Sequence, residues 1–148
     1  MVPGLAFRES MQGSYWRLDA PTEVLSVAVT LDARADVTSL LRDRQLAVSG
    51  VIDVERLATE RPLEGTLAFR FARHGRFHYR LRFQGDEGGD YELGGQTEWS
   101  PLAPVSSLEV LAASLYDASN QELGRGTLRF PSRSGLWKVL RTVRLAVR

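Results

Sequence analysis

The sequence predicts an all-β fold, either an antiparallel β-barrel or a β-sandwich, of about eight to nine strands with two short helices. In the segment 67–95, most apolar and aromatic residues occupy odd positions, and arginines occupy positions 70, 80 and 82. A period of two puts alternate side chains on opposite faces, as in a half-buried strand. No low-complexity linker divides the 148 residues. We therefore expect a single β-domain spanning residues 1–148.

Further strands are expected on both sides of this segment, because β-branched and aromatic residues recur in short runs. These runs are residues 14–18, 24–31, 46–54, 108–116, 126–130 and 143–147. Turn or break residues separate them, at positions 19–21, 32–35, 60–62, 100–105 and 117–122. Gly50 lies inside one of the runs and is a candidate β-bulge.

Two segments have the periodicity of short helices. Asp36 and Ser134 are each placed to accept the free N–H groups of a first helical turn. The apolar residues that follow share one helical face, at Val37, Leu40 and Leu41 in the first helix and at Leu136, Val139 and Leu140 in the second. Each helix is expected to be about one or two turns long.

Turn chemistry predicts how the strands of segment 67–95 pair. A three-residue loop at residues 73–75, with Gly75 in the left-handed conformation, keeps inward residues opposite inward residues. The resulting pairs are Phe71–Phe77, Phe69–Tyr79 and Leu67–Leu81. A two-residue loop would pair Phe71 with His78 and mix an aromatic with a polar residue on one face. We therefore expect the three-residue loop.

Across the next loop, residues 85–89, the same reasoning pairs Phe83 with Tyr91 and Leu81 with Leu93. Arg82 then stands opposite Glu92 on the solvent face, as an ordinary cross-strand ion pair.

The outward positions of these strands form a candidate anion-binding or partner surface, made by Arg70, His78, Arg80 and Arg82. Such a stripe can bind a phosphate, a carboxylate or an anionic membrane surface. A solvated strand face carries the same charges to stay soluble, and the expected pairing of Arg82 with Glu92 favours this second interpretation.

Composition and motifs argue against several classes of function. A net charge of +1 does not favour a dedicated nucleic-acid-binding protein. The chain has no cysteine, and its two histidines have no carboxylates at metal-ligand spacing. No dinucleotide fingerprint or Gly-x-Ser-x-Gly elbow occurs. We therefore expect no cofactor, no metal and no catalytic residue, so that the chain is not an enzyme.

No apolar run approaches about 18 residues, and the N-terminus lacks a basic segment followed by an apolar one. We therefore expect a soluble, cytoplasmic chain without a transmembrane segment.

Several stretches together resemble a known family. Residues 7–13 resemble a Phe-(Thr/Ser)-Glu-x-Met-x-Gly opening, although Arg8 stands where that pattern has a small hydroxyl residue. The other matching stretches are residues 27–31 with 36–41, 79–83 with 91–95, and 124–130 with 140–144. Across about residues 7–147, the chain resembles the β-rich accessory domain of bacterial cholesterol-oxidase-like proteins of the glucose-methanol-choline oxidoreductase group.

This resemblance implies a role in sterol or lipid metabolism beside a partner enzyme. It does not imply oxidation by this chain, because the flavin-binding portion of those proteins has no counterpart here. Gly95-Gln96-Thr97 replaces an expected Gly-Phe-Lys, so a ligand contact at that position is not carried over.

Two functions remain open. The first is a non-catalytic module that binds or presents a hydrophobic, lipid-like or sterol-like molecule. Its candidate ligand contacts are the inward aromatic residues Phe69, Phe71, Tyr79, Phe83 and Tyr91. The second is a structural or protein-docking domain, which includes self-association into a homo-oligomer. A pocket of about 300 Å³ or more favours the first function, and a core filled by the same aromatic residues favours the second.

Overall fold

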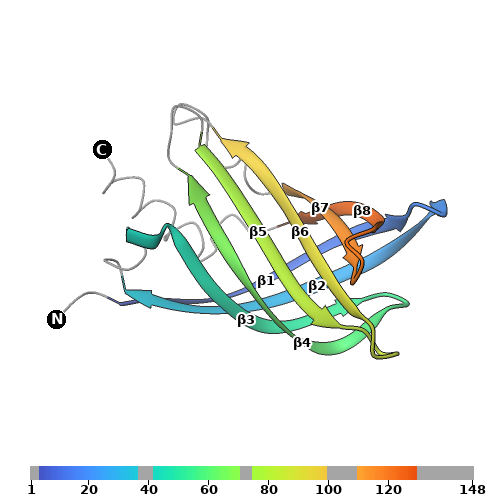
Figure 1. Cartoon of the computed structure of the whole chain (residues 1–148), viewed down its shortest axis with the longest axis horizontal. Coiled ribbons are helices and arrows are strands. Elements are labelled where there is room, and N and C mark those ends of the chain that lie inside the picture. The colour runs from blue at the N-terminus through green and yellow to red at the C-terminus, as the bar shows by residue number, and fades with distance from the viewer. Residues whose placement is uncertain (1–3, 37–41, 71–74, 100–109, 130–148) are drawn as a thin grey trace.

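The computed structural model is a closed barrel of eight antiparallel strands, in which each strand pairs with the next and β8 pairs with β1 (Figure 1). The structure describes residues 4–36, 42–70, 75–99 and 110–129. The strands are β1 (Gly4–Arg17), β2 (Ala20–Asp36), β3 (Gln45–Val54), β4 (Ala58–Arg70), β5 (Gly75–Gln84), β6 (Asp90–Trp99), β7 (Val110–Asp117) and β8 (Glu122–Arg129). The all-β prediction is confirmed, and of its two architectures the barrel is the one observed.

The core follows the alternation seen in the sequence. In β3, buried residues alternate with exposed ones, and β7 repeats the pattern. The inward rows are mostly leucine and valine, and the β-branched valine side chains suit strands. Ile52, Leu67, Leu81 and Leu128 are completely buried, and each such burial is worth about 1.5–3 kcal/mol.

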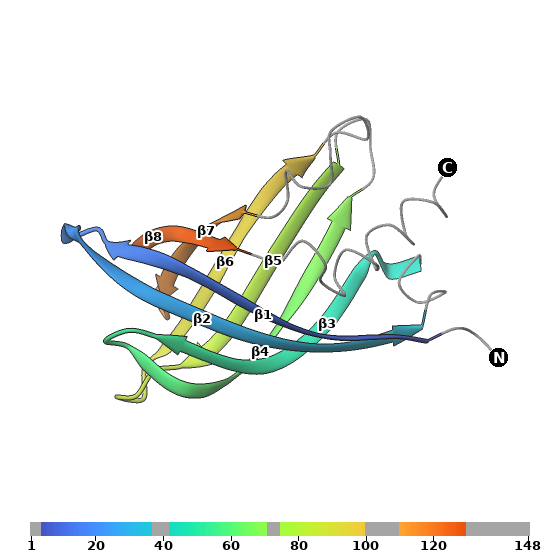
Figure 2. The same ribbon diagram turned by 180° about the vertical axis from the view of Figure 1, so that it is seen from behind.

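The two ends of the barrel differ. One end carries four short turns at residues 18–19, 55–57, 85–89 and 118–121, and we call it the turn end. At the turn end, β6 pairs with β7 over Tyr91–Gly94, and β8 pairs with β1 over Gln12–Arg17. Farther from the turn end, these two pairings stop. The longer strands therefore extend past β7 and β8, as the view from behind shows (Figure 2).

Gly50 is not a β-bulge, because its pairing with Leu31 on one side and Leu63 on the other is continuous. A Cβ at Gly50 would lie 1.8 Å from the carbonyl oxygen of Thr30. The backbones of β2 and β3 therefore approach more closely than any side chain allows, and glycine lets the sheet curve into a barrel at this point.

The expected break at residues 60–62 is also wrong, because these residues lie inside β4. The irregularity is a register shift between Ile52 and Val54, opposite which Glu60 adopts a positive φ of 46°. The Glu60 N–H donates to the Asp53 carboxylate at 2.8 Å, which stabilises this unusual conformation.

The register predicted between β4 and β5 is wrong by two residues. Leu67 pairs with Tyr79, and Phe69 pairs with Phe77. A shift of two keeps every residue on its predicted face, so alternation could not distinguish the two registers. The observed register puts Gly65 opposite Leu81, where a Cβ would lie 2.0 Å from the Arg80 carbonyl oxygen. Only glycine fits this close approach.

The pairing predicted between β5 and β6 is confirmed, with Phe83 opposite Tyr91 and Arg82 opposite Glu92. The turn expected at residues 32–35 is wrong, since these residues continue β2. Asp36, the expected helix cap, is the last residue of that strand.

The remaining residues of the two expected helices lie outside the described part of the chain, as do the loop expected at 100–105 and the strand expected at 143–147. Among the described residues, no helix is long and apolar enough to span a membrane.

Candidate functional site

The interior of the barrel is filled near the turn end. Between Tyr15, Val27 and Leu93 the packing leaves a gap of about 10 Å³, which is no larger than one water molecule needs. A small-molecule ligand ordinarily occupies about 300–1,000 Å³. A ligand therefore has no room inside this part of the barrel and must bind at its surface or at its end.

A pocket of about 560 Å³ opens at the turn end, and we call it the end pocket. Its volume lies within the range of ordinary ligand sites. The residues that line it come from strand ends and from two of the turns, and they are Tyr15, Arg17, Arg56, Leu57, Asp86, Glu87, Tyr91, Leu115 and Leu123. Closure of the barrel brings these distant parts of the sequence together.

The floor of the end pocket is apolar and continuous with the core. Leu115 is buried, and Leu57, Tyr91 and Leu123 are partly buried and pack against the core. The ring of Tyr91 stacks on Phe83, with ring centroids 5.8 Å apart. A ligand that covers this floor would remove the exposed apolar surface of these side chains from water.

Tyr15 fixes one wall of the pocket. Its hydroxyl donates to the carbonyl oxygen of Glu55 at 2.5 Å, and burial raises the pKa of the hydroxyl. The Glu55 carboxylate accepts the Ser26 N–H at 2.7 Å, and the Glu55 N–H donates to the Ser26 carbonyl. The turn at residues 55–57 is therefore tied to β1 and β2.

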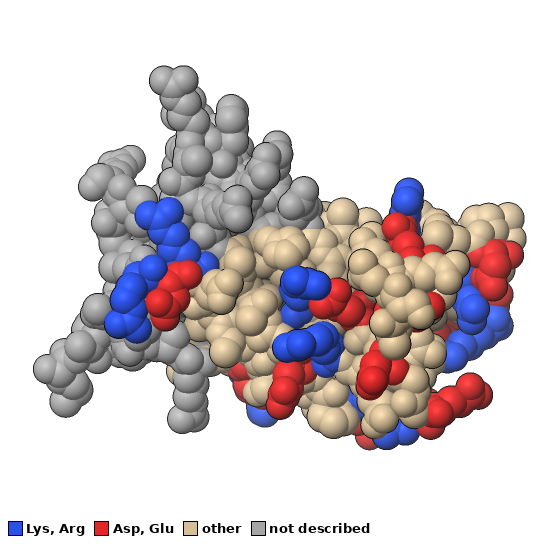
Figure 3. Space-filling model, viewed as in Figure 1, with Lys and Arg blue, Asp and Glu red and all other residues tan. Residues whose placement is uncertain are grey.

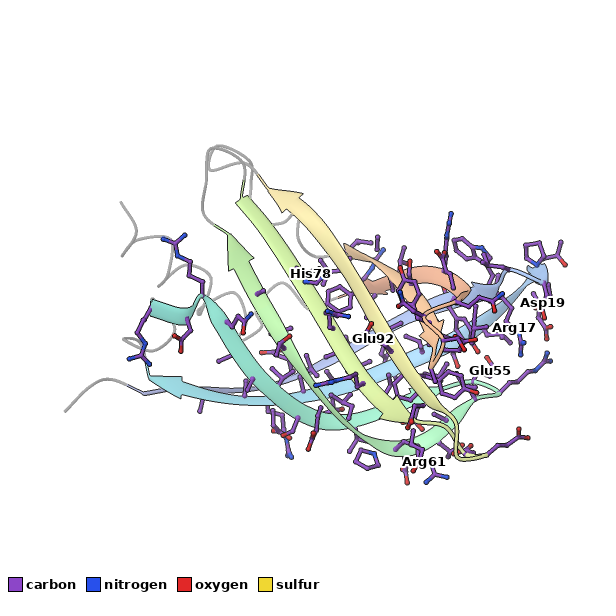
Figure 4. The ribbon with its side chains drawn as sticks, in the orientation of Figure 1. Arg17, Asp19, Glu55, Arg61, His78 and Glu92 are labelled. Atoms are coloured by element: carbon purple, nitrogen blue, oxygen red, sulfur yellow. The ribbon has the colours of Figure 1, made fainter. Side chains whose placement is uncertain are left out.

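The rim of the pocket is charged. Arg17 pairs with Asp19 at 3.2 Å, and Arg56 pairs with Glu23. Figure 4 shows Arg17, Asp19 and Glu55 at this end of the barrel, while His78 and Glu92 lie along the wall away from it. Both arginine side chains keep about half of their surface exposed, 45% for Arg17 and 59% for Arg56.

The two rim carboxylates have different surroundings. Asp86 accepts hydrogen bonds from the Thr59 N–H and hydroxyl, both at 2.9 Å, and from Arg61 at 3.0 Å. The Thr59 N–H, followed by Arg61 and the Thr59 hydroxyl, holds the pKa of Asp86 below its usual value. Glu87 is exposed, and it forms no hydrogen bond or ion pair within the described residues.

The predicted ligand residues are only partly brought together. Tyr91 lines the end pocket, and Phe83 is buried behind it. Tyr79 is 2% exposed and donates its hydroxyl to the Ala112 carbonyl, which gives it a structural role. The side chain of Phe69 and the whole of Phe71 lie outside the described residues.

The described residues of the predicted anion surface lie on a solvent-exposed strand face. His78, Arg80 and Arg82 are exposed on the outside of β5, and the Arg70 side chain is outside the described residues. Glu92 forms its ion pair with Arg80, at 3.1 Å, and not with Arg82 as predicted. Basic and acidic side chains are intermixed on the face shown in Figure 3, so no patch of one sign forms there.

Two outer grooves, of about 730 and 570 Å³, share Glu64 and Arg82 in their walls. The apolar part of the larger groove is mostly alanine and glycine with one valine, and this groove is more open to solvent than the end pocket. The smaller groove has four carboxylates in its wall, from Glu64, Asp90, Glu92 and Asp117. The end pocket is more enclosed than either groove and has an apolar floor, so we regard it as the better candidate site for a ligand with an apolar part.

Within the described ranges, no three histidine, cysteine or acidic side chains are grouped so as to hold a metal ion. Glu9 is the one charged residue that is buried there, in the inward row of β1 next to Met11.

Comparison with protein-family models, curated proteins and solved structures found no match to this chain.

Proposed function

We propose that this chain is a non-catalytic β-barrel module that binds a hydrophobic small molecule in its end pocket. The observation that carries the proposal is the end pocket itself, with an apolar floor of three leucines and Tyr91 beside a filled interior. The resemblance to the accessory domain of cholesterol-oxidase-like proteins favours a lipid-like or sterol-like ligand, which the module would present to a partner enzyme.

The size of the pocket is compatible with a useful affinity. An alkyl chain that buries about 250 Å² of apolar surface gains about 6 kcal/mol from transfer out of water. A dissociation constant of about 100 μM corresponds to about 5.5 kcal/mol. Further contacts with the pocket walls must offset the entropy cost of association for the affinity of a simple chain to reach this value.

Filling the pocket tests the proposal. The variant Leu123→Trp puts a large side chain at a partly buried position of the floor. Val110→Trp makes the same change on the exposed outer face of β7 and is the matched control. Binding of dodecanol or of a sterol to each protein is measured by isothermal titration calorimetry.

We expect saturable binding below about 100 μM for the unmodified chain and for Val110→Trp, and at least about tenfold weaker binding for Leu123→Trp. The proposal is wrong if no apolar ligand saturates the unmodified chain, or if the two variants bind equally well.

A docking role is the second candidate, and exposed apolar side chains on the β1–β2 hairpin favour it. Trp16, Leu18 and Val24 are 36%, 45% and 70% exposed. Association of the chain with itself, measured by sedimentation, together with absence of ligand binding, would support docking in place of ligand binding.

A further inference from the structure

We infer that the ligand of the end pocket is an amphiphile with an anionic head group, a carboxylate or a phosphate, held between Arg17 and Arg56. This inference rests on the proposed function and specifies the class of ligand. It is carried by the arrangement of charges around a pocket whose floor is apolar.

The two guanidinium groups belong to the same opening. Arg17 ends β1 and Arg56 lies in the turn at residues 55–57, and both line the pocket. Both also act electrostatically on the Tyr15 hydroxyl in the wall, where each lowers the pKa that burial raises, whereas the Glu55 and Glu23 carboxylates raise it. Both guanidinium groups therefore lie within electrostatic range of an anion bound beside that hydroxyl.

Each guanidinium keeps free hydrogen-bond donors. Arg17 uses Nε and Nη2 on Asp19, and Arg56 uses Nη1 on Glu23. A guanidinium has five N–H donors, so both can still donate to a head group in the pocket. The existing ion pairs restrict the two side chains and so reduce the entropy lost on binding.

The carboxylates nearby oppose this attraction, but three of them already have a cationic partner. Asp19 pairs with Arg17, Glu23 with Arg56 and Asp86 with Arg61. Glu55 accepts a hydrogen bond from the Ser26 N–H. Glu87 is the rim carboxylate without a described partner, and it would repel an anionic head group. A carboxylate or phosphate is the partner that the planar, bidentate guanidinium group fits best.

The test compares dodecanoate, dodecyl phosphate, dodecanol and dodecyltrimethylammonium below their micelle concentrations, by calorimetry on the full chain. We expect at least one anionic amphiphile to bind about tenfold or more tightly than dodecanol, and the cationic one to bind more weakly than dodecanol. The tighter of dodecanoate and dodecyl phosphate identifies the head group.

Three substitutions assign the effect. Arg17→Gln and Arg56→Gln should each reduce the preference for the anion over dodecanol, measured on the same variant, to about threefold or less, and a thermal melt of each variant reports that the barrel is intact. Glu87→Gln should increase the preference. Arg82→Gln, on the outer wall of β5, is the control and should leave the preference for the anion over dodecanol unchanged.

The outcomes separate the two claims. Equal binding of dodecanol and both anions, or an anion preference that survives both arginine substitutions, overturns the anionic-head inference and leaves the proposed function standing. An anion preference lost in Arg82→Gln instead moves the anion site to the outer wall and also overturns the inference. Failure of all four amphiphiles to bind overturns the proposed function itself.

Discussion

The hydroxyl of Tyr79 on β5 donates a 2.6 Å hydrogen bond to the carbonyl oxygen of Ala112 on β7, although β6 lies between the two strands. Pairing between β6 and β7 stops at Gly94 and Ser114. A Cβ at Gly95 would lie 2.3 Å from the same carbonyl oxygen. Tyr79 therefore reaches across a glycine to satisfy a carbonyl at the point where two barrel strands separate.

Tyr79→Phe should lower the free energy of unfolding by about 1–2 kcal/mol, because it leaves this carbonyl without its donor in a partly buried place. Urea denaturation measures the change. Tyr116→Phe is the control, since the described structure gives its hydroxyl no hydrogen bond, and it should change stability by less than about 0.5 kcal/mol. Equal losses in the two variants would refute the role given to Tyr79.

Gly50→Ala should destabilise the fold by more than about 2 kcal/mol, because backbone atoms of β2 must move to make room for a Cβ. Ser49→Ala, one residue earlier and on the outer face, should change stability by less than about 0.5 kcal/mol. Thermal or urea melts of the two variants give the comparison. A Gly50→Ala protein as stable as the unmodified chain would show that β2 and β3 are not so close.

Leu67→Ala should cost about 2–5 kcal/mol of stability, since Leu67 is fully buried and its truncation leaves a cavity. Arg80→Ala removes an exposed ion pair with Glu92 and should cost less than about 1 kcal/mol. Denaturant melts of both variants test which face of the sheet is inward. Comparable losses would contradict the assignment of faces.

Asp86 should make stability depend on pH. Its folded pKa is depressed, so its contribution is present above the usual aspartate pKa of about 4 and is lost as the pH falls through the folded value. Asp86→Asn should therefore be less stable than the unmodified chain at neutral pH, and the two should converge in acid.

Asp90→Asn is the matched control, because the described structure gives the Asp90 carboxylate no hydrogen bond or ion pair. In melts recorded from neutral pH into acid, we expect Asp90→Asn and the unmodified chain to have the same stability at every pH. A difference between Asp86→Asn and the unmodified chain that stays constant with pH would contradict the account.

Alternation in the sequence was sufficient to predict which residues of segment 67–95 face inward, because period-two burial needs only local information. Leu67, Tyr79 and Leu81 are inward as predicted. It could not fix the register of β4 and β5, since a slip of two residues leaves all faces unchanged. The close approach at Gly65 is visible only once both backbones are in place.

The end pocket was less accessible to sequence reasoning than the strands. Tyr91 alone was predicted among its residues, since the pocket is assembled by barrel closure from separate strand ends and turns. The turn at residues 55–57 was missed because its left-handed residue is Arg56, with a φ of 68°, and not a glycine or asparagine. The break was instead expected at residues 60–62, because of Pro62, and these residues lie inside β4.

The central claim, that the end pocket binds an apolar ligand, is tested most directly by nuclear magnetic resonance during a titration with dodecanol. Methyl and amide resonances are followed for every assigned residue. The account predicts saturable shifts at Leu57, Leu115 and Leu123 and at Tyr91, with the outer wall around Arg80 and Arg82 unchanged. An absence of saturable shifts, or shifts confined to the outer wall, would contradict it.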